Sequence, residues 1–320
     1  MSDPLNKLDA RLSLNDSQVE HFREYGYSEV FRYEPALDHQ AMIDLYHRFE
    51  HVFVKGRFMH RRGELSETCQ WNKSVFAIVP EFYDIATNPF IVEKVASILG
   101  ENLICWGGSF IRRQPGHIHP WHLDTEVTTW GGVNVFIGLA GTSKESSLHI
   151  LAHSHQLPLE PGLRFFDNRE VEEYAKGQPI DTQIKTLAMT DGDFCIFNGR
   201  ALHGSNNQSD QIRCALLFQY TTPDQAIRIK ATKQTPEDWY EKAPVVLCKG
   251  SDAYGLNNLI SRPSNSKPAI ERKEFYAMEG ARIAATGMSL QDYNDKKDRE
   301  QEQRLMFRRR IRELKKSQSA

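Results

Sequence analysis

The pattern of apolar and polar residues changes partway along the chain, and its first part predicts helices. Capping residues at 13–16 precede an amphipathic stripe that ends near Gly26, and a second stripe runs from about His39 to Val54. A third stripe, from Pro89 to Leu99, begins with proline and is followed by a glycine, as helices often are. We therefore expect residues 1–102 to form a helical N-terminal part.

The next part of the chain has the pattern of a β-protein. Short apolar runs separated by turn residues are typical of a β-sandwich or barrel, and they are found at Ile104–Phe110, Val133–Leu139, Leu148–Leu151, Phe194–Phe197 and Ala215–Tyr220. The long polar stretch from Pro158 to Asp191 is predicted to be a surface loop or lid. With no repeat or linker in the sequence, we expect one domain over residues 1–320. It would have a β-core at about 103–225 and a C-terminal loop and helical extension at 226–320.

Composition narrows the possible partners and the compartment. Forty Lys and Arg residues against 42 Asp and Glu residues give a net charge of −2, which argues against binding to nucleic acid through bulk charge. Five cysteines without a CxxC pair fit a reducing compartment. The polar N-terminus is unlike a signal peptide, and no apolar run approaches the ~20 residues of a membrane span. We expect a cytoplasmic protein with no membrane span.

One segment of the β-region carries candidate metal chemistry, Trp121-His122-Leu123-Asp124. Alternate side chains of a strand share a face, so His122 and Asp124 would lie roughly 6–7 Å apart along it. With a second histidine from another strand they would form the two-His, one-carboxylate face of non-haem Fe(II) oxygenases. A surface polar pair is the alternative, because short His-x-Asp patterns also arise by chance.

A second segment supplies the missing partners. Residues 192–205 contain a glycine turn, an apolar strand and then His203 among small residues, and Arg213 begins the next apolar strand. An antiparallel return would bring Arg213 near His203. Arginine suits bidentate capture of a carboxylate, so an acidic cosubstrate could lie between the metal and Arg213.

Together these segments resemble the phytanoyl-CoA dioxygenase family of Fe(II)- and 2-oxoglutarate-dependent oxygenases. The resemblance spans roughly residues 14 to 225 and covers, in order, Phe22–Tyr27, Val95–Gly100, Trp121–Asp124, Gly138–Ala140, Ser146–Leu151, His153–His155 and Asp191–Tyr220. One departure is Ala152-His153-Ser154-His155, where the family usually has Pro-Gly-Ser-His.

The resemblance implies a double-stranded β-helix, or jelly roll: an all-β core with flanking helices. It implies that His122, Asp124 and His203 bind iron, that Arg213 binds the distal carboxylate of 2-oxoglutarate, and that Ser205 assists through its hydroxyl group. The implied reaction, with O₂, hydroxylates or otherwise oxidises an unactivated C–H bond of a small-molecule metabolite and releases succinate and CO₂. Because the family's halogenating relatives have a small residue in place of the carboxylate, Asp124 favours hydroxylation.

Other residues leave alternatives open. His117 and His119 are loop residues, partners of the ligands or competing ligands, and the cluster His149, His153 and His155 lies at a core or rim. Candidate substrate residues are Arg112 (or its neighbour Arg113), Trp130 (or Trp106) and Asn134, each of which also suits a strand face or the core.

Two other functions remain possible on the sequence alone: a non-catalytic jelly-roll ligand-binding protein, and a cupin-type metal oxygenase that does not use 2-oxoglutarate. Residues 299–316 carry eight Lys and Arg residues against three Glu. They suit a solvated terminal helix or contact with RNA, an acidic partner or a membrane surface. The sequence predicts neither the substrate nor the oligomeric state.

Overall fold

The computed structural model describes residues 12–34, 36–53, 58–62, 65–69, 73–77, 79–124, 130–160, 162–228, 242–264 and 272–288. Its contacts divide the chain into two compact units, Met1–Ala269 and Ile270–Ala320. The second unit contains helix α8 (Arg272–Ala284), and all elements named below belong to the first. A single domain over 1–320 stays a prediction, and the basic segment at 299–316 lies outside the described residues.

The predicted N-terminal helices are present, and their ends have the expected caps. The Asn15 side chain accepts a hydrogen bond from Gln18 N, the Gln18 side chain accepts one from Asn15 N, and Gly26 ends the helix with φ 82°. Asn88 caps a later helix that begins at Pro89. The helices are α2 (Asp16–Tyr25), α3 (His39–Phe53), α4 (Pro80–Ala86) and α5 (Pro89–Leu99). Among the residues with assigned positions, no helix is both long and apolar enough to cross a membrane.

Four of the five predicted apolar runs form strands of a large, mostly antiparallel sheet, whereas the fifth, Leu148–Leu151, belongs to a second sheet. The large sheet also contains the unpredicted strands Phe31–Arg32, Pro244–Lys249 and Asn258–Leu259, of which the last two lie beyond the predicted β-core at 103–225. Only its last pair, β13 and β14, is parallel. Its seven strands, in spatial order, are β1 (Phe31–Arg32), β10 (Asp193–Asn198), β6 (Val133–Ala140), β12 (Arg213–Thr221), β4 (Leu103–Arg113), β13 (Pro244–Lys249) and β14 (Asn258–Leu259).

A second, antiparallel sheet has five strands: β8 (Arg164–Phe165), β5 (Ile118–His122), β11 (His203–Asn206), β7 (Leu148–Leu151) and β9 (Ile184–Leu187). Strands β2 (Phe58–Arg62) and β3 (Leu65–Cys69) pair separately as a hairpin. Short 3₁₀ turns complete the described elements: η2 (Val75–Ala77), η4 (Lys144–Ser146) and η5 (Ser154–Gln156).

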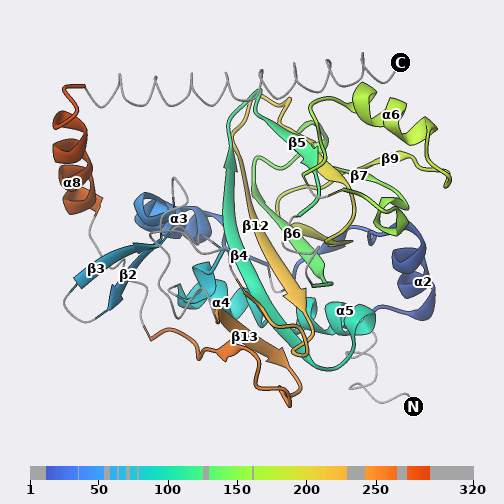
Figure 1. Cartoon of the computed structure of the whole chain (residues 1–320), viewed down its shortest axis with the longest axis horizontal. Coiled ribbons are helices and arrows are strands. Elements are labelled where there is room, and N and C mark those ends of the chain that lie inside the picture. Colours follow the sequence, from blue (N-terminus) through green and yellow to red (C-terminus); the bar gives the residue numbers. More distant parts are fainter. Residues whose placement is uncertain are drawn as a thin grey trace. The chain divides into compact units, whose positions relative to one another are not determined.

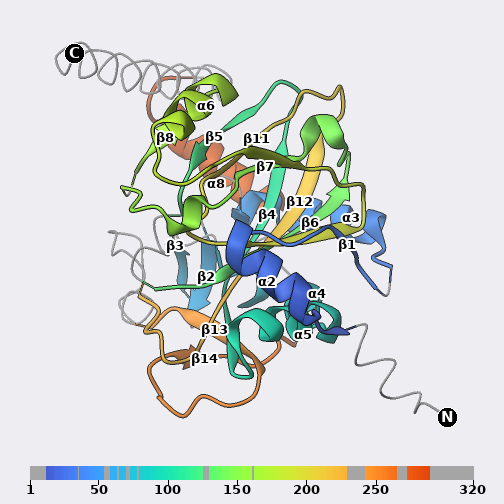
Figure 2. The ribbon, with the colours of Figure 1, turned by 90° about the vertical axis from the view of Figure 1, so that its right-hand side faces the viewer.

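The large sheet is buried on both faces, which explains its nearly continuous apolar strands. Along β12, Leu216, Phe218 and Tyr220 pack into a core with the N-terminal helices, whereas Ala215 packs into a core shared with the smaller sheet. Figure 1 shows β4 and β12 between helices α3 and α4 on one side and β5 and β7 on the other. Figure 2 views the molecule from the side on which β5 and β7 lie, with β4 and β12 behind them. The fold is the predicted double-stranded β-helix with flanking helices.

The prediction of a surface loop or lid at Pro158–Asp191 is wrong for much of that stretch. It contains β8, helix α6 (Asn168–Lys176) and β9, which pairs with β7 at the edge of the smaller sheet. Val171 of α6 is buried in a third core with Trp121 and Phe165. The two strands are short edge strands, and Val171 is the one buried residue of α6, so the stretch lacks the long apolar runs by which the other strands were predicted.

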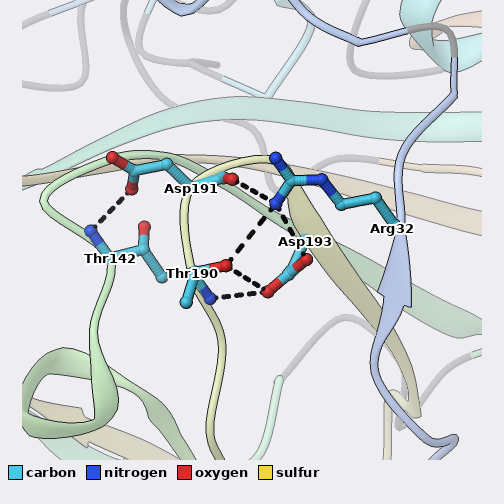
Figure 3. A network of polar contacts seen from close by, with 5 residues as sticks. All are labelled: Arg32, Thr142, Thr190, Asp191 and Asp193. Atoms are coloured by element: carbon cyan, nitrogen blue, oxygen red, sulfur yellow. Dashed lines mark hydrogen bonds and ion pairs between the residues drawn. The ribbon is translucent and has the colours of Figure 1, made fainter.

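The turn before β10 is held by a network of polar contacts (Figure 3). Arg32 donates to the Asp191 carbonyl at 2.6 Å and to Asp193 at 3.2 Å, while Asp193 accepts from the Thr190 amide at 2.7 Å. Asp191 in turn accepts from Thr142 N at 2.8 Å. The Gly-Asp motif of this segment therefore secures the β9–β10 turn to β1 and to the loop after β6.

Candidate metal centre and cosubstrate pocket

A cavity of about 340 Å³ lies between the two sheets. Its lining includes His122, Asp124 and His203. It also includes Ser205, two residues after His203 on β11, and Arg213, which is hydrogen-bonded to Ser205. Polar and charged side chains make up much of the lining, and both sheets also contribute apolar ones, among them Phe136, Leu148, Phe197 and Leu217. Pockets that combine apolar walls with convergent polar groups are the usual form of small-molecule sites.

The structure brings the three candidate ligands together. Atoms of His122, Asp124 and His203 that could bind a metal all lie within 4.8 Å of one another, and all three residues are buried. His122 ends β5 and pairs in register with His203, the first residue of β11. Asp124 lies two residues beyond the end of β5, so the expectation that it shares a strand face with His122 is wrong. Its Oδ1 nevertheless lies 3.7 Å from His122 Nε2.

Both imidazole rings are oriented by the backbone. His122 Nδ1 lies 2.8 Å from the Pro120 carbonyl oxygen, and His203 Nδ1 lies 2.9 Å from the Ala201 carbonyl oxygen. Because a carbonyl oxygen only accepts, each Nδ1 must carry the proton. Each Nε2 then has a free lone pair, the tautomer that a metal-binding histidine needs.

The carboxylate of Asp124 is oriented by two buried amides. Asp124 Oδ2 accepts from Asn134 Nδ2 at 2.7 Å and from Gln219 Nε2 at 3.0 Å. Gln219 Nε2 also lies 3.1 Å from Asn134 Oδ1, so the two amides support each other. With Oδ2 occupied, Oδ1 is the oxygen that remains for a metal. Gly107 leaves room for this arrangement, because a Cβ there would come within 2.6 Å of Gln219 Oε1.

The electrostatic environment favours the metal-binding forms of these side chains. Burial and the neighbouring His203 lower the pKa of His122 to about 3, so its ring is neutral near pH 7. Burial alone would raise the pKa of Asp124, but His203 and Lys73 outweigh it and hold that pKa below its ordinary value. The site therefore offers a neutral imidazole at His122 and a carboxylate at Asp124.

Arg213 also lines the cavity, where two hydrogen bonds hold its guanidinium. Its side chain is 1% exposed, Nη1 donates to the Ser146 carbonyl at 2.5 Å, and Nη2 donates to Ser205 Oγ at 3.1 Å. Nε is buried without a partner among the described residues. Burial lowers the pKa of Arg213 to about 10, which leaves it charged near pH 7. It reaches Ser205 across the cavity, because β12 and β11 belong to different sheets and not to a returning hairpin.

The candidate substrate residues lie in different places. Asn134 supports Asp124, as described above. Trp130 packs edge-on against Trp106 at 5.2 Å between ring centres and belongs to the core under the helices, not to the cavity lining. Arg113 lines the cavity, whereas its neighbour Arg112 does not.

The remaining histidines of the sequence analysis are outside the triad. His119 lines the cavity, and its ring lies edge-on to that of His122 at 4.5 Å. His149 contacts Thr186 and stacks on Trp121, which places it away from the cavity lining. His153 adopts φ 62°, so it keeps the left-handed turn for which the family's pattern has glycine.

Sequence reasoning missed Gln219 and Lys73. Gln219 could have been found from spacing, since it lies six residues after Arg213 and so on the same face of β12. Lys73 also lines the cavity, but it lies in the short segment 73–77, which contains no recognisable motif.

Comparisons with known proteins agree with this geometry. A family model described as phytanoyl-CoA dioxygenase (PhyH) matches residues 22–215. No curated protein matches the sequence. Similar solved structures include the non-heme monooxygenase ThoJ in its apo form, with a TM-score of 0.54 and 19% identity over 81% of this chain and 94% of that one.

Two further structures are similar at comparable levels. One is CytC3 with Fe(II) and alpha-ketoglutarate, with a TM-score of 0.55 and 15% identity over 82% of this chain and 98% of that one. The other is the non-heme alpha ketoglutarate dependent carbocyclase SnoK from nogalamycin biosynthesis, with a TM-score of 0.52 and 18% identity over 70% of this chain and 89% of that one. At these identities the likeness concerns the fold.

Proposed function

Because the chain belongs to the phytanoyl-CoA dioxygenase family, we propose that it hydroxylates an unactivated C–H bond of a small-molecule metabolite with Fe(II), 2-oxoglutarate and O₂. One observation carries the proposal. One cavity is lined both by three residues whose metal-binding atoms lie close together and by a buried guanidinium whose Nε has no partner among the described residues. A dicarboxylate cosubstrate would join the two.

The donor set fits Fe(II). Two imidazole Nε2 atoms and one carboxylate oxygen are the facial triad of non-haem iron oxygenases, which leaves the remaining coordination positions for cosubstrate and O₂. His122, Asp124 and His203 would hold the ion, and the Pro120 and Ala201 carbonyls and the amides of Asn134 and Gln219 would orient the ligands.

The surroundings of Arg213 fit the distal carboxylate of 2-oxoglutarate. Arg213 Nε is an orphaned buried donor, which a carboxylate oxygen would satisfy. Ser205 Oγ accepts from Arg213 Nη2, so the hydroxyl proton of Ser205 is free to donate to the same carboxylate. Apolar side chains of the lining, among them Leu217, would exclude water from the bound cosubstrate.

When bound, the iron supplies the redox chemistry: O₂ and 2-oxoglutarate give succinate and CO₂, and one oxygen atom enters the substrate C–H bond as a hydroxyl group. The protein contributes position and electrostatics. Asp124 Oδ2 stays with its two amide donors while Oδ1 faces the metal position, and Arg213 and Ser205 fix the far end of the cosubstrate. Because Asp124 occupies the third ligand position, a hydroxylase is favoured over a halogenase.

Succinate release tests this function directly. Purified protein with Fe(II), 2-oxoglutarate and O₂ should form succinate slowly by itself and faster with its substrate, which a metabolite library would identify. His203→Ala should abolish both rates. His149→Ala, which changes a histidine outside the cavity, is the matched control and should retain them. Wild-type protein that forms no succinate and is stimulated by no metabolite would support a ligand-binding protein instead.

Arg213→Ala separates the remaining alternative. The variant should lose 2-oxoglutarate turnover at ordinary cosubstrate concentrations. A cupin-type oxygenase that does not use 2-oxoglutarate would oxidise its substrate equally well with or without this arginine. A cytoplasmic location and the absence of a nucleic-acid partner remain predictions from composition.

A further inference from the structure

A second guanidinium in the cavity has no role in the chemistry described so far. Arg113 is the last residue of β4, pairs in register with Arg213 of β12, and lines the same cavity. Its Nη1 donates to the Arg112 carbonyl at 3.3 Å, and its Nε is buried without a partner among the described residues. Arg113 and Arg213 thus both line the cavity, and each has an Nε without a partner among the described residues.

No described carboxylate of the cavity balances this charge. Among the lining residues that the structure describes, Asp124 is the one acidic side chain, and it faces the metal position. Iron(II), the two guanidiniums and Lys73 carry five positive charges, whereas Asp124 and 2-oxoglutarate carry three negative ones. Among the described lining residues positive charge is therefore in excess, in a place of low dielectric where an unpaired charge is costly.

Arg113 lies closer to the solvent than Arg213 does. Arg213 is fully buried, whereas Arg113 is half-buried and precedes the exposed turn at 114–117. Arg113 thus stands nearer the rim, where a substrate that enters after 2-oxoglutarate would meet it. Burial also lowers the pKa of Arg113, the expected result of partial desolvation without an acidic partner.

We propose that Arg113 binds a carboxylate group of the substrate, so that the enzyme acts on small carboxylic acids. This inference rests on the proposed function, because it assigns Arg213 to 2-oxoglutarate. A planar carboxylate matches the guanidinium edge, and the cavity of about 340 Å³ limits the size of the acid. The bound carboxylate would supply part of the missing negative charge and orient the substrate toward the metal.

The test uses benzoate and its neutral analogue benzamide on holoenzyme held without O₂, with Fe(II) and saturating 2-oxoglutarate. Binding is measured as the shift in thermal midpoint and in visible absorption as either compound is added. Wild-type protein should bind benzoate and discriminate against benzamide. Arg113→Gln should weaken benzoate at least about tenfold, equivalent to about 1.4 kcal/mol, without weakening benzamide. Arg113→Lys should restore part of the affinity, since it keeps the charge but loses the fork.

Arg112→Gln is the matched control. It removes the same charge from the adjacent residue of β4, whose side chain is not part of the cavity lining, and should bind benzoate like wild type. Thermal unfolding of each variant without ligands checks that it is folded.

Several results would overturn the inference. One is equal benzoate affinity in wild type and Arg113→Gln, or no binding to wild type. Another is that Arg113→Gln raises the 2-oxoglutarate concentration needed for half-saturation, which would assign Arg113 to the cosubstrate. If inorganic phosphate binds through Arg113 and benzoate does not, the inferred substrate would be a phosphate ester and not a carboxylic acid. Failure of wild type to form succinate from 2-oxoglutarate overturns the proposed function itself, whereas intact succinate formation with unselective benzoate binding overturns this inference alone.

Discussion

The amide of Gln219 offers a sharp test of how the metal carboxylate is held. Gln219→Met keeps the length of the side chain and removes its donor and acceptor. Asp124 Oδ2 would keep one donor, Asn134, and Asn134 Oδ1 would lose the amide 3.1 Å away. The side chain is 1% exposed, so water cannot easily replace what is lost.

The magnitude follows from these contacts. A hydrogen bond to a charged group contributes about 1.5–3 kcal/mol, and groups that orient metal ligands typically change metal affinity by about 10–100-fold. We expect the Fe(II) concentration for half-maximal succinate formation to rise by about 10–100-fold. The orphaned Asn134 oxygen should also lower the free energy of unfolding of the metal-free protein by about 1–3 kcal/mol.

The assay is an Fe(II) titration of succinate formation, with urea unfolding of the metal-free protein alongside. Gln40→Met is the matched control, because Gln40 donates to the Asp44 carboxylate at 2.7 Å on the exposed face of α3. It should change neither quantity by more than about 0.5 kcal/mol. A folded Gln219→Met protein whose Fe(II) requirement stays within about twofold of wild type would refute the assignment of Gln219 to the ligand.

Three further predictions concern other parts of the molecule. Arg213→Ala should raise the 2-oxoglutarate concentration for half-maximal succinate formation at least about 100-fold, because the variant loses about 3 kcal/mol of charge-assisted hydrogen bonding. An unchanged concentration would show that Arg213 is not part of the cosubstrate site. Gly204→Ala should lower the free energy of unfolding by about 1–3 kcal/mol, seen as a lower urea midpoint, because the new Cβ would lie 3.1 Å from backbone atoms of Trp121. An unchanged midpoint would mean that β5 and β11 can separate freely. Burial lowers the pKa of Lys94 to about 8, below its unfolded value of 10.5, so the unfolded chain binds more protons between these values. Wild type should therefore gain stability relative to Lys94→Met as the pH rises from about 8 to about 10.5, and a difference independent of pH would contradict this.

Most of the fold could be predicted because buried strands and capped helices leave clear patterns of apolar and capping residues in the sequence. Strands buried on both faces, such as Ala215–Tyr220, give apolar runs that few loops have. Helices with a proline at the first position and a glycine after the last, as at Pro89–Leu99, show both ends in sequence. The stretch at Pro158–Asp191 could not be interpreted in this way, because β9 pairs on one edge only and leaves polar side chains in solvent.

The site was predicted less completely than the fold. Spacing along a strand suggested that His122 and Asp124 act together, but β5 ends at His122, and Asp124 comes close to it from outside the strand. Strand spacing cannot predict where the strand ends. Gln219 was hidden because a single amide within an apolar strand resembles a tolerated core residue. Whether Arg112 or Arg113 faces the cavity depends on the register of β4 in the sheet, and this register cannot be determined from the sequence of the strand alone.

The most direct test of the central claim is the visible absorption spectrum of the protein titrated with Fe(II) and 2-oxoglutarate without O₂. A chelate of 2-oxoglutarate with Fe(II) at His122, Asp124 and His203 should give a visible charge-transfer band that needs both components and saturates near one Fe(II) per chain. The band should be absent from His203→Ala and retained in the control His149→Ala. Wild-type protein that gives no band under these conditions, and no succinate when O₂ is admitted, would contradict the account.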